Sequence, residues 1–261
     1  MIAPSVATIA SIYRYPVKGL TPESLTEVAL QAGQTLPGDR AYAIENGPSG
    51  FDPANPVWKA KTHYLMLMRN ERLAALRTHF DDATHTLSIT AGGAEVARGD
   101  LRTANGRAAI EAFFAAGFAD ELRGPPKLLV GAGYSFSDVA MKVVSIINLA
   151  SVEALAQVVG RAVHPLRFRA NLYVRGWPAW HEFDLLGQTL AIGDARLKVV
   201  KRIVRCAAAN VDPDTAARDL EIPATLQRTH GHADCGVYAE VIDGGRIASG
   251  DAVEVEEARL L

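Results

Sequence analysis

Residues 197–215 read LKVVKRIVRCAAANVDPDT, a stretch that combines a strong strand pattern with the most informative side chain of the protein. Residues 197–204 alternate apolar and basic positions and predict a β-strand. The strand delivers Cys206 to the start of a loop that a Val-Asp-Pro-Asp turn closes. Arg202 and Arg205 flank the thiol, and basic neighbours favour the thiolate, the form that ligates metals or attacks sulfur. An isolated cysteine is more often a small buried apolar group. The rest of the sequence is therefore needed to decide whether Cys206 is a functional thiol.

Short apolar or alternating segments separated by turn residues recur on both sides of this stretch. They predict further strands at residues 6–17, 24–30, 40–44, 86–90, 143–147, 171–174, 189–192, 237–242 and 252–255. Many short strands with glycine-rich turns favour barrels or sandwiches. We therefore predict an α+β fold that is mainly β.

Helical spacing of apolar residues occurs in two places. One apolar stripe at residues 110–118 predicts a helix of about three turns. A second helix is predicted to begin with Ser151 as its N-cap. Two consecutive prolines lie between these helices and predict a domain boundary, with residues 1–124 in the first domain and residues 125–261 in the second.

The composition excludes several classes of protein. The 261 residues carry a net charge of −2, which gives no bulk indication of nucleic-acid binding. No apolar run approaches the roughly 18 residues of a membrane span. Cys206 and Cys235 are too few for a disulfide scaffold, and residues 1–5 lack the basic start of a signal peptide. We expect a cytoplasmic protein without nucleic-acid or membrane partners.

Three short motifs place basic side chains beside predicted strand ends: YPVKG at 15–19, GDR at 38–40 and RFRAN at 167–171. Arginine forks suit phosphates and planar heterocycles. Each charge alone is more often a solvated surface group. Taken with Cys206, the motifs predict an anionic ligand with a polar ring and a soft metal.

In this order along the chain, the motifs resemble those of the MOSC superfamily. The ending Gly236-Val237-Tyr238, Gly245 and Gly250-Asp251 fits as well. The resemblance is to the two-domain branch, which includes the amidoxime-reducing component and its bacterial relatives. It implies an N-terminal β-barrel-like domain, a MOSC-type β-barrel domain with a few flanking helices, and a molybdenum cofactor (Mo-molybdopterin) in the cleft between them.

The resemblance also implies roles for individual residues. Cys206 matches the molybdenum-ligating, catalytic cysteine. Lys18 and Arg40 match contacts to the pterin and phosphate, Arg169 and Asn171 match a further binding pair, and Asn148 and Ser151 match a segment that approaches the phosphate at a helix N-terminus. We add Arg205, beside the thiol, to the predicted cofactor contacts. No pyridoxal phosphate site is expected.

Two departures from the family pattern concern the substrate side. The family's Lys-Ser pair is Lys18-Gly19 here, so one hydroxyl contact is missing. Residues 46–63 predict a long irregular loop, of a kind that is uncommon unless it serves a site or is disordered. Its segment Trp58-Lys59-Ala60-Lys61-Thr62 does not align with the family's Thr-Ala-Arg-Gln motif. The sequence therefore does not identify the residues that would face the substrate.

The implied activity is reduction of N-oxygenated, chiefly N-hydroxylated, small molecules. The chain ends at Leu261 without a ferredoxin-like domain, so electrons are expected from a separate ferredoxin-, flavodoxin- or cytochrome-type partner. Two alternatives remain: a sulfur carrier with a Cys206 persulfide for metal–sulfur cofactor assembly, and a non-catalytic carrier of the molybdenum cofactor. Cys235 has no predicted role, and the His-x-His pair at 230–232 is too little for a metal site and predicts a surface loop.

Overall fold

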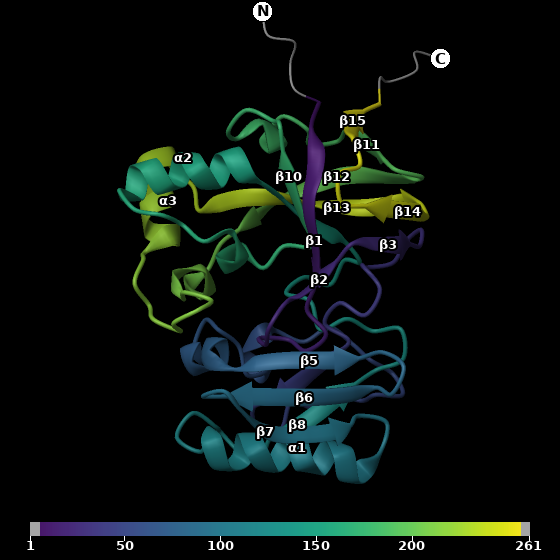
Figure 1. Ribbon diagram of the computed structural model, residues 1–261, viewed down its shortest axis with the longest axis vertical. Coiled ribbons are helices and arrows are strands. Elements are labelled where there is room, and N and C mark those ends of the chain that lie inside the picture. Colours follow the sequence, from purple (N-terminus) through teal and green to yellow (C-terminus); the bar gives the residue numbers. More distant parts are fainter. Residues whose placement is uncertain (1–5, 257–261) are drawn as a thin grey trace, which may run out of the picture.

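The computed structural model describes residues 6–256 and shows two bodies stacked along the long axis of the molecule (Figure 1). The N-terminal residues 1–5, over which no signal peptide was predicted, lie outside the described residues. The chain is 34% strand and 21% helix, which confirms the predicted α+β fold with mainly β structure.

The upper body in Figure 1 is built on one curled sheet of eight strands. Strands β9 and β10 run parallel, and the other neighbours in the sheet run antiparallel. The order across the sheet is β15 (Val253–Val255), β11 (Thr189–Ile192), β12 (Ala195–Val204), β13 (Asp234–Asp243), β9 (Val144–Asn148), β10 (Leu172–Arg175), β1 (Thr8–Arg14) and β2 (Glu23–Leu25). A separate pair, β3 (Glu27–Leu30) with β14 (Gly245–Ala248), lies beside this sheet.

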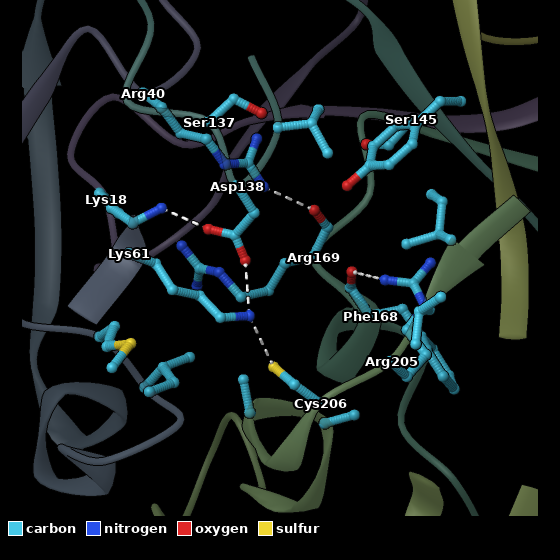
Figure 2. A pocket seen from close by; sticks show the side chains of 18 of the residues that line it. Lys18, Arg40, Lys61, Ser137, Asp138, Ser145, Phe168, Arg169, Arg205 and Cys206 are labelled. Atoms are coloured by element: carbon cyan, nitrogen blue, oxygen red, sulfur yellow. Dashed lines mark hydrogen bonds and ion pairs between the residues drawn. The ribbon is translucent and has the colours of Figure 1, made fainter. Parts of the chain in front are cut away.

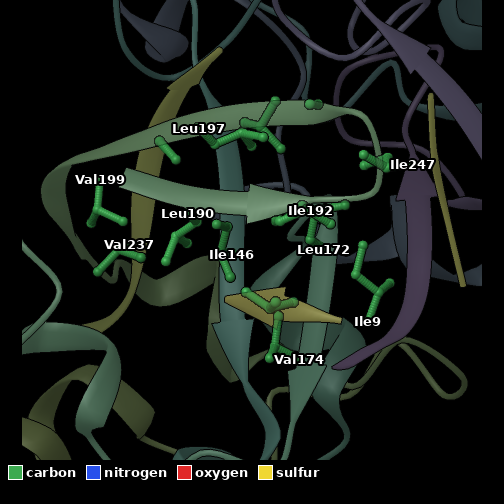
Figure 3. Close-up of a cluster of buried hydrophobic side chains, with 14 of the residues drawn as sticks. Ile9, Ile146, Leu172, Val174, Leu190, Ile192, Leu197, Val199, Val237 and Ile247 are labelled. Atoms are coloured by element: carbon green, nitrogen blue, oxygen red, sulfur yellow. The ribbon is translucent and has the colours of Figure 1, made fainter. Parts of the chain in front are cut away.

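Apolar side chains on one face of this sheet pack into the core shown in Figure 3, and others, such as Ile147 and Tyr173, pack into a second core with α2 (Leu149–Val159) and α3 (Ile222–His230). On the first half of β12 the buried positions follow the period of a strand, because Leu197 and Val199 point inward while Arg196 and Lys198 face out. Ile9 from β1 and Ile146 from β9 are fully buried in the same core. Burial of each such side chain stabilises the fold by about 1.5–3 kcal/mol.

The lower body holds a three-stranded antiparallel sheet, a two-stranded sheet and one helix. The strands are β5 (Arg77–Asp81), β6 (Thr86–Ala91) and β7 (Ala94–Asp100), and β4 (Tyr42–Glu45) with β8 (Lys127–Val130). Helix α1 (Ala104–Gly117) lies directly on β7, because a Cβ on Gly99 would lie only 2.1 Å from the Gly106 carbonyl oxygen. Thr103 caps the helix by accepting the Gly106 N–H.

Strand pairing crosses the predicted boundary between residues 124 and 125. Strands β1 and β2 come from the first 25 residues, yet they belong to the large sheet of the upper body. Strand β8 follows the predicted boundary, yet it pairs with β4 of the lower body. The division at 124 therefore does not separate the two bodies, and as a boundary between folding units it stays a prediction.

Two helices, α2 (Leu149–Val159) and α3 (Ile222–His230), flank the upper sheet. Asn148 caps α2 by accepting the Ala150 N–H at 3.1 Å, so the prediction of Ser151 as the cap is wrong by three residues. The prediction of a surface loop around His230 is also wrong, because this residue ends α3. Among residues 6–256, no helix has both the length and the apolar character needed to cross a membrane.

Five 3₁₀ turns complete the description of residues 6–256. They are η1 (Lys61–His63), η2 (Glu71–Ala75), η3 (Pro165–Phe168), η4 (His181–Phe183) and η5 (Ala207–Asn210). Three of them, η1, η3 and η5, supply walls of the cavity described next.

Candidate functional site

A cavity of about 250 Å³ lies between the two bodies, and its lining comes from both (Figure 2). Its walls are rich in basic side chains, with a single thiol among them. Six of the eight residues predicted for the site line it: Lys18, Arg40, Arg169, Asn171, Arg205 and Cys206. Their roles are not tested by this placement, but the fold brings them together from segments up to 188 positions apart in the sequence, from 18 to 206.

Cys206 stands at the start of a firmly anchored loop. Its carbonyl oxygen accepts the Ala209 N–H at 3.0 Å and begins η5. The guanidinium of Arg167, buried beneath the loop, donates to the Asn210 carbonyl oxygen at 2.9 Å and to the carboxylates of Asp212 and Asp219 at 2.7 Å each. The thiol is half-buried and held in place at the cavity wall.

The sulfur of Cys206 has a cationic neighbour that the sequence did not reveal. Lys61 Nζ lies 3.2 Å from Cys206 Sγ and 3.2 Å from Asp138 Oδ2, while the other oxygen of Asp138 accepts from Lys18 (Figure 2). Burial acts to lower the pKa of Lys61, but the charges of Asp138 and Cys206 outweigh it and raise that pKa. The Lys61 ammonium is therefore a fixed positive charge beside the sulfur.

Asp138 joins the two lysines of the cavity. Burial alone would raise its pKa, yet the ammonium groups of Lys18 and Lys61 hold that pKa far below its usual range. Burial lowers the pKa of Lys18 in spite of this partner. One carboxylate thus holds two buried or half-buried cations against the cavity.

Arg40 and Arg169 form a second basic group around the ring of Tyr15. Their guanidinium carbons lie 4.8 and 4.2 Å from the ring centroid. Arg40 donates to the Arg169 carbonyl oxygen at 2.9 Å and pairs with Asp39. Both arginines adopt left-handed backbone conformations, with φ of 52° and 50°, a strain that is common at binding sites. Burial lowers the pKa of Arg169 to about 10.

Among the described residues that line this cavity, three guanidinium nitrogens are buried without a hydrogen-bond partner: Arg167 Nε, beneath the Cys206 loop, and one nitrogen each of Arg169 and Arg205. Arg205 donates to the carbonyl oxygens of Cys235 at 2.7 Å and Phe168 at 2.8 Å, yet its Nη2 is buried and unpaired. The Nη2 of Arg169 is likewise buried and unpaired. A buried charged donor without a partner costs free energy, and an anionic acceptor beside Arg169 and Arg205 would offset that cost.

Asn171 lines the cavity, but its amide is already used within the fold. Its oxygen accepts from the backbone N–H and the hydroxyl of Ser145, at 3.1 and 2.8 Å. Its nitrogen donates to the Tyr13 carbonyl oxygen at 3.2 Å. Asn171 thus links β1 and β9 at the start of β10, and its hydrogen bonds to a ligand ring stay a prediction.

Asn148 and Ser151 do not line the cavity, and their approach to a phosphate stays a prediction. Both side chains are fully buried and donate to Glu182 Oε2, at 3.0 and 2.8 Å. A carboxylate from the chain itself thus occupies the N-terminus of α2, where an anion was expected. Burial raises the pKa of Glu182 above its ordinary value.

Arg202, Cys235 and His230 each pack against other side chains of the fold or lie in its core. Arg202 lines the cavity, and its guanidinium lies against the ring of Phe183, 4.3 Å from the ring centroid. Cys235 is fully buried, and burial raises the pKa of its thiol to about 12, in line with a core residue. His230 packs on Trp180 at 4.6 Å. Within residues 6–256, no group of three or more His, Cys, Asp or Glu side chains is placed to hold a metal.

Sequence reasoning missed Lys61 and Asp138. Lys61 lies near the end of the long loop predicted at 46–63 and begins η1. The length of the loop indicated a functional site but not which of its residues takes part in it. Asp138 is the last residue of the segment SFSD at 135–138, which forms no strand. Only the fold brings these two side chains together.

Two family models match the chain. The model described as the MOSC N-terminal beta barrel domain matches residues 6–118, and the model described as the MOSC domain matches residues 129–254. Together they span most of the sequence. No curated protein matches significantly.

Solved structures resemble this fold at low sequence identity. The YuaD protein from Bacillus subtilis is 12% identical, over 97% of each chain, with a TM-score of 0.45. YiiM from Geobacillus stearothermophilus is 19% identical over 45% of this chain and 55% of its own, with a TM-score of 0.36. YiiM from Escherichia coli is 19% identical over 44% of this chain and 54% of its own, with a TM-score of 0.34. The chain thus spans about half the length of each YiiM protein.

The family models give the better guide to identity, because they match two successive regions that carry the motifs described above. Their order along one chain shows that this protein belongs to the MOSC family, in the two-domain branch that has a MOSC N-terminal β-barrel domain ahead of the MOSC domain.

Proposed function

We propose that the cavity between the bodies binds a molybdenum cofactor, and that the protein reduces N-oxygenated small molecules with electrons from a separate donor protein. The observation that carries this proposal is the pair of buried, unpaired guanidinium nitrogens of Arg169 and Arg205, in the same cavity as the half-buried thiol of Cys206. A ligand that is anionic at one end and bears a soft metal at the other would satisfy both features.

The residues present fit such a cofactor. Cys206 offers one thiolate, a ligand that soft metal centres favour. Arg169, Arg205, Arg40 and Lys18 would neutralise the cofactor's phosphate and bind its polar ring. When bound, the cofactor would supply the two-electron redox chemistry, as cofactors do in such enzymes.

The side chains of the protein would hold and orient the reacting groups. The Lys61 ammonium donates to the Cys206 sulfur and would stabilise negative charge there. Asp138 fixes Lys61 and Lys18 in place, so this charge needs no rearrangement when a ligand binds.

The electron donor and the location stay part of the proposal. A ferredoxin-, flavodoxin- or cytochrome-type protein would supply the electrons. Both cysteines of the described residues are free thiols, which agrees with a reducing compartment such as the cytoplasm.

One alternative has an observation in its favour. A sulfur carrier needs an accessible thiolate, and the half-buried Cys206 beside Lys61 would serve as one. A persulfide on Cys206, however, leaves the unpaired nitrogens of Arg169 and Arg205 without a purpose. The third possibility, a carrier that binds the cofactor without catalysis, differs from the enzyme only in turnover.

Turnover separates these candidates. Protein purified from a host that makes the cofactor is supplied with dithionite-reduced methyl viologen and N-hydroxybenzamidine. The reaction consumes two electrons and two protons, breaks the N–O bond, and yields benzamidine and water. We expect product from the parent and from Cys235→Ser, and none above background from Cys206→Ser. Bound cofactor without product in the parent would support the carrier, and equal rates in all three proteins would contradict a role for Cys206.

A further inference from the structure

A second cavity adjoins the first and is assigned to no function by the motifs. It has a volume of about 120 Å³ and shares walls with the main cavity at Gly19, Leu67, Arg167, Arg169 and Ala208. Ala208 lies in η5, two residues after Cys206. We call this space the annex. The annex therefore adjoins the candidate site.

The remaining walls of the annex are mostly apolar. They come from both bodies and include Leu20, Leu73, Leu76, Leu166 and Val211. Arg77, Arg167 and Arg169 also line it, but Arg77 pairs with Asp214 and Arg167 with Asp212 and Asp219, while Arg169 lies at the wall shared with the main cavity. Lys18, Arg40 and Arg205 do not line the annex. Transfer of an anion into apolar surroundings is costly, so the annex favours an apolar group.

The volume of the annex sets the size of that group. An engineered apolar cavity of about 150 Å³ in another protein holds one benzene molecule. At about 120 Å³, and sharing walls with the main cavity, the annex has room for one six-membered ring or a branched aliphatic group of similar size.

Gly19 lies at the wall that the two cavities share, and it leaves no room there for a side chain. It lines both, and a Cβ at this position would lie 3.1 Å from Leu73 Cδ1 and 3.2 Å from the Leu65 carbonyl oxygen. Its φ of +84° also disfavours any other residue. At the opposite wall, Arg77 donates to the Asp214 carbonyl oxygen at 3.1 Å and links the two bodies.

We propose that the annex binds the apolar substituent of the substrate, a single aromatic ring or an aliphatic group of that size, while the N–O group of the same molecule lies beside Cys206. This inference rests on the proposed function and adds to it a substrate class: N-hydroxylated compounds with one compact apolar substituent. Compounds with a methyl group in its place would reach Cys206 without filling the annex.

The neighbouring residues Ala74 and Ala75 provide a matched pair of variants. Ala74 is half-buried and lines the annex, whereas Ala75 is exposed and does not. Ala74→Leu adds three carbon atoms to the wall, and Ala75→Leu adds the same atoms in solvent. If Ala74→Leu does not give a cooperative thermal transition, Ala74→Val tests the same wall with a smaller addition.

Binding is measured first, with benzene as the probe and thermal stability as the readout. We expect benzene to raise the melting temperature of the parent and of Ala75→Leu, and to have little effect on Ala74→Leu. Calorimetry with the cofactor-loaded protein then compares N-hydroxybenzamidine with N-hydroxyacetamidine. Ala74→Leu should bind the phenyl compound at least about tenfold more weakly and the methyl compound unchanged, because even small changes in an apolar pocket alter affinity by this much.

The outcomes separate this inference from the proposed function. Equal binding of benzene and of the phenyl compound to the parent and to Ala74→Leu would overturn the annex proposal, whatever turnover shows. If the phenyl compound binds in an Ala74-dependent way but neither compound is reduced, the annex proposal stands and the reductase proposal falls.

Discussion

Cys206 and Cys235 are the same chemical group in two different environments. Cys206 is half-buried at the wall of the cavity, with a lysine ammonium 3.2 Å from its sulfur. Cys235 is fully buried in β13, and its pKa is raised to about 12. Because the thiolate is the reactive form, only Cys206 combines access with an environment that suits reaction.

This contrast predicts the reactivity of the native protein toward a thiol reagent. Cofactor-free protein should release about one equivalent of thionitrobenzoate from Ellman's reagent at pH 8, and about two after unfolding in guanidinium. Cys206→Ser should abolish the native reaction, and Cys235→Ser should leave it unchanged. A native reaction that survives in Cys206→Ser would show that the wrong thiol has been placed at the cavity.

The unpaired nitrogens of Arg169 and Arg205 predict anion binding without the cofactor. Inorganic pyrophosphate should raise the melting temperature of cofactor-free protein, because a ligand at 100 times its Kd stabilises the folded state by about 2.7 kcal/mol. Arg169→Gln should lose most of this increase. Arg98→Gln, on an exposed side chain of the lower body, is the control for net charge. The same increase in parent and Arg169→Gln would contradict an anion site at Arg169.

Local motifs at the residue scale identified the cationic residues of the site but not their arrangement. Lys18, Arg40, Arg169 and Arg205 could be predicted because each lies in a short motif. Lys61 could not, because its contact with Cys206 joins positions 145 apart in the sequence and depends on the packing of two bodies.

At the scale of single elements, periodicity predicted the strands well. The strand predicted at 189–192 has the bounds of β11, because its alternation is regular and turns flank it. Helix α3 was missed because Pro223 lies at its start and much of its surface is polar, so only Ile222, Thr225 and Leu226 are buried. The short, exposed strands β5 and β7 carry too few apolar residues for a period to show.

The cap of α2 shows why a correct element can still mislead about function. Ser151 was assigned to the helix terminus from residue type alone, whereas the fold places the Glu182 carboxylate there. One carboxylate oxygen of Glu182 accepts two hydrogen bonds, while the other is buried and unpaired. An anion from the chain fills the position that local reasoning gave to a phosphate.

Glu182 predicts a pH dependence of stability. Burial raises its pKa in the folded state, so the folded protein binds this proton more tightly than the unfolded chain. The stabilising contribution is present below the unfolded pKa of about 4.3 and is lost as the pH rises through the folded pKa. Each unit of pKa shift corresponds to about 1.4 kcal/mol.

Glu182→Gln removes this proton from the balance while it keeps an oxygen for Asn148 and Ser151. Urea unfolding at several pH values should show that the variant gains stability relative to the parent as the pH rises from 4 to 8. A difference between the two proteins that does not change with pH would contradict an ionisable group with a raised pKa at this position.

At the scale of the whole molecule, the two bodies are interlaced by the chain. Strand β1 pairs with β10 and buries Ile9 and Ile12 in the upper core, although it precedes the entire lower body. The carboxylate of Glu71 in η2 pairs with Arg218 of the upper body at 3.0 Å. The cavity is therefore set by a tertiary arrangement that no single segment contains.

This interlacing predicts the behaviour of a fragment. Residues 125–261 alone should fail to unfold cooperatively, because the loss of β1 leaves one side of β10 unpaired and removes buried side chains of the core. The intact chain should show a cooperative transition under the same conditions. A fragment with native near-ultraviolet dichroism and a sharp transition would instead support the predicted boundary at 124 as a division between folding units.

The central claim is that Cys206 and the arginines around it hold a molybdenum cofactor, and the content of molybdenum and pterin tests it most directly. Both are measured in protein purified from a host that makes the cofactor, for the parent, Cys206→Ser and Cys235→Ser. We predict near-stoichiometric metal and pterin in the parent and in Cys235→Ser, and loss of the metal in Cys206→Ser. The absence of both metal and pterin from the parent, with Cys206 reactive, would contradict the claim and favour a sulfur carrier.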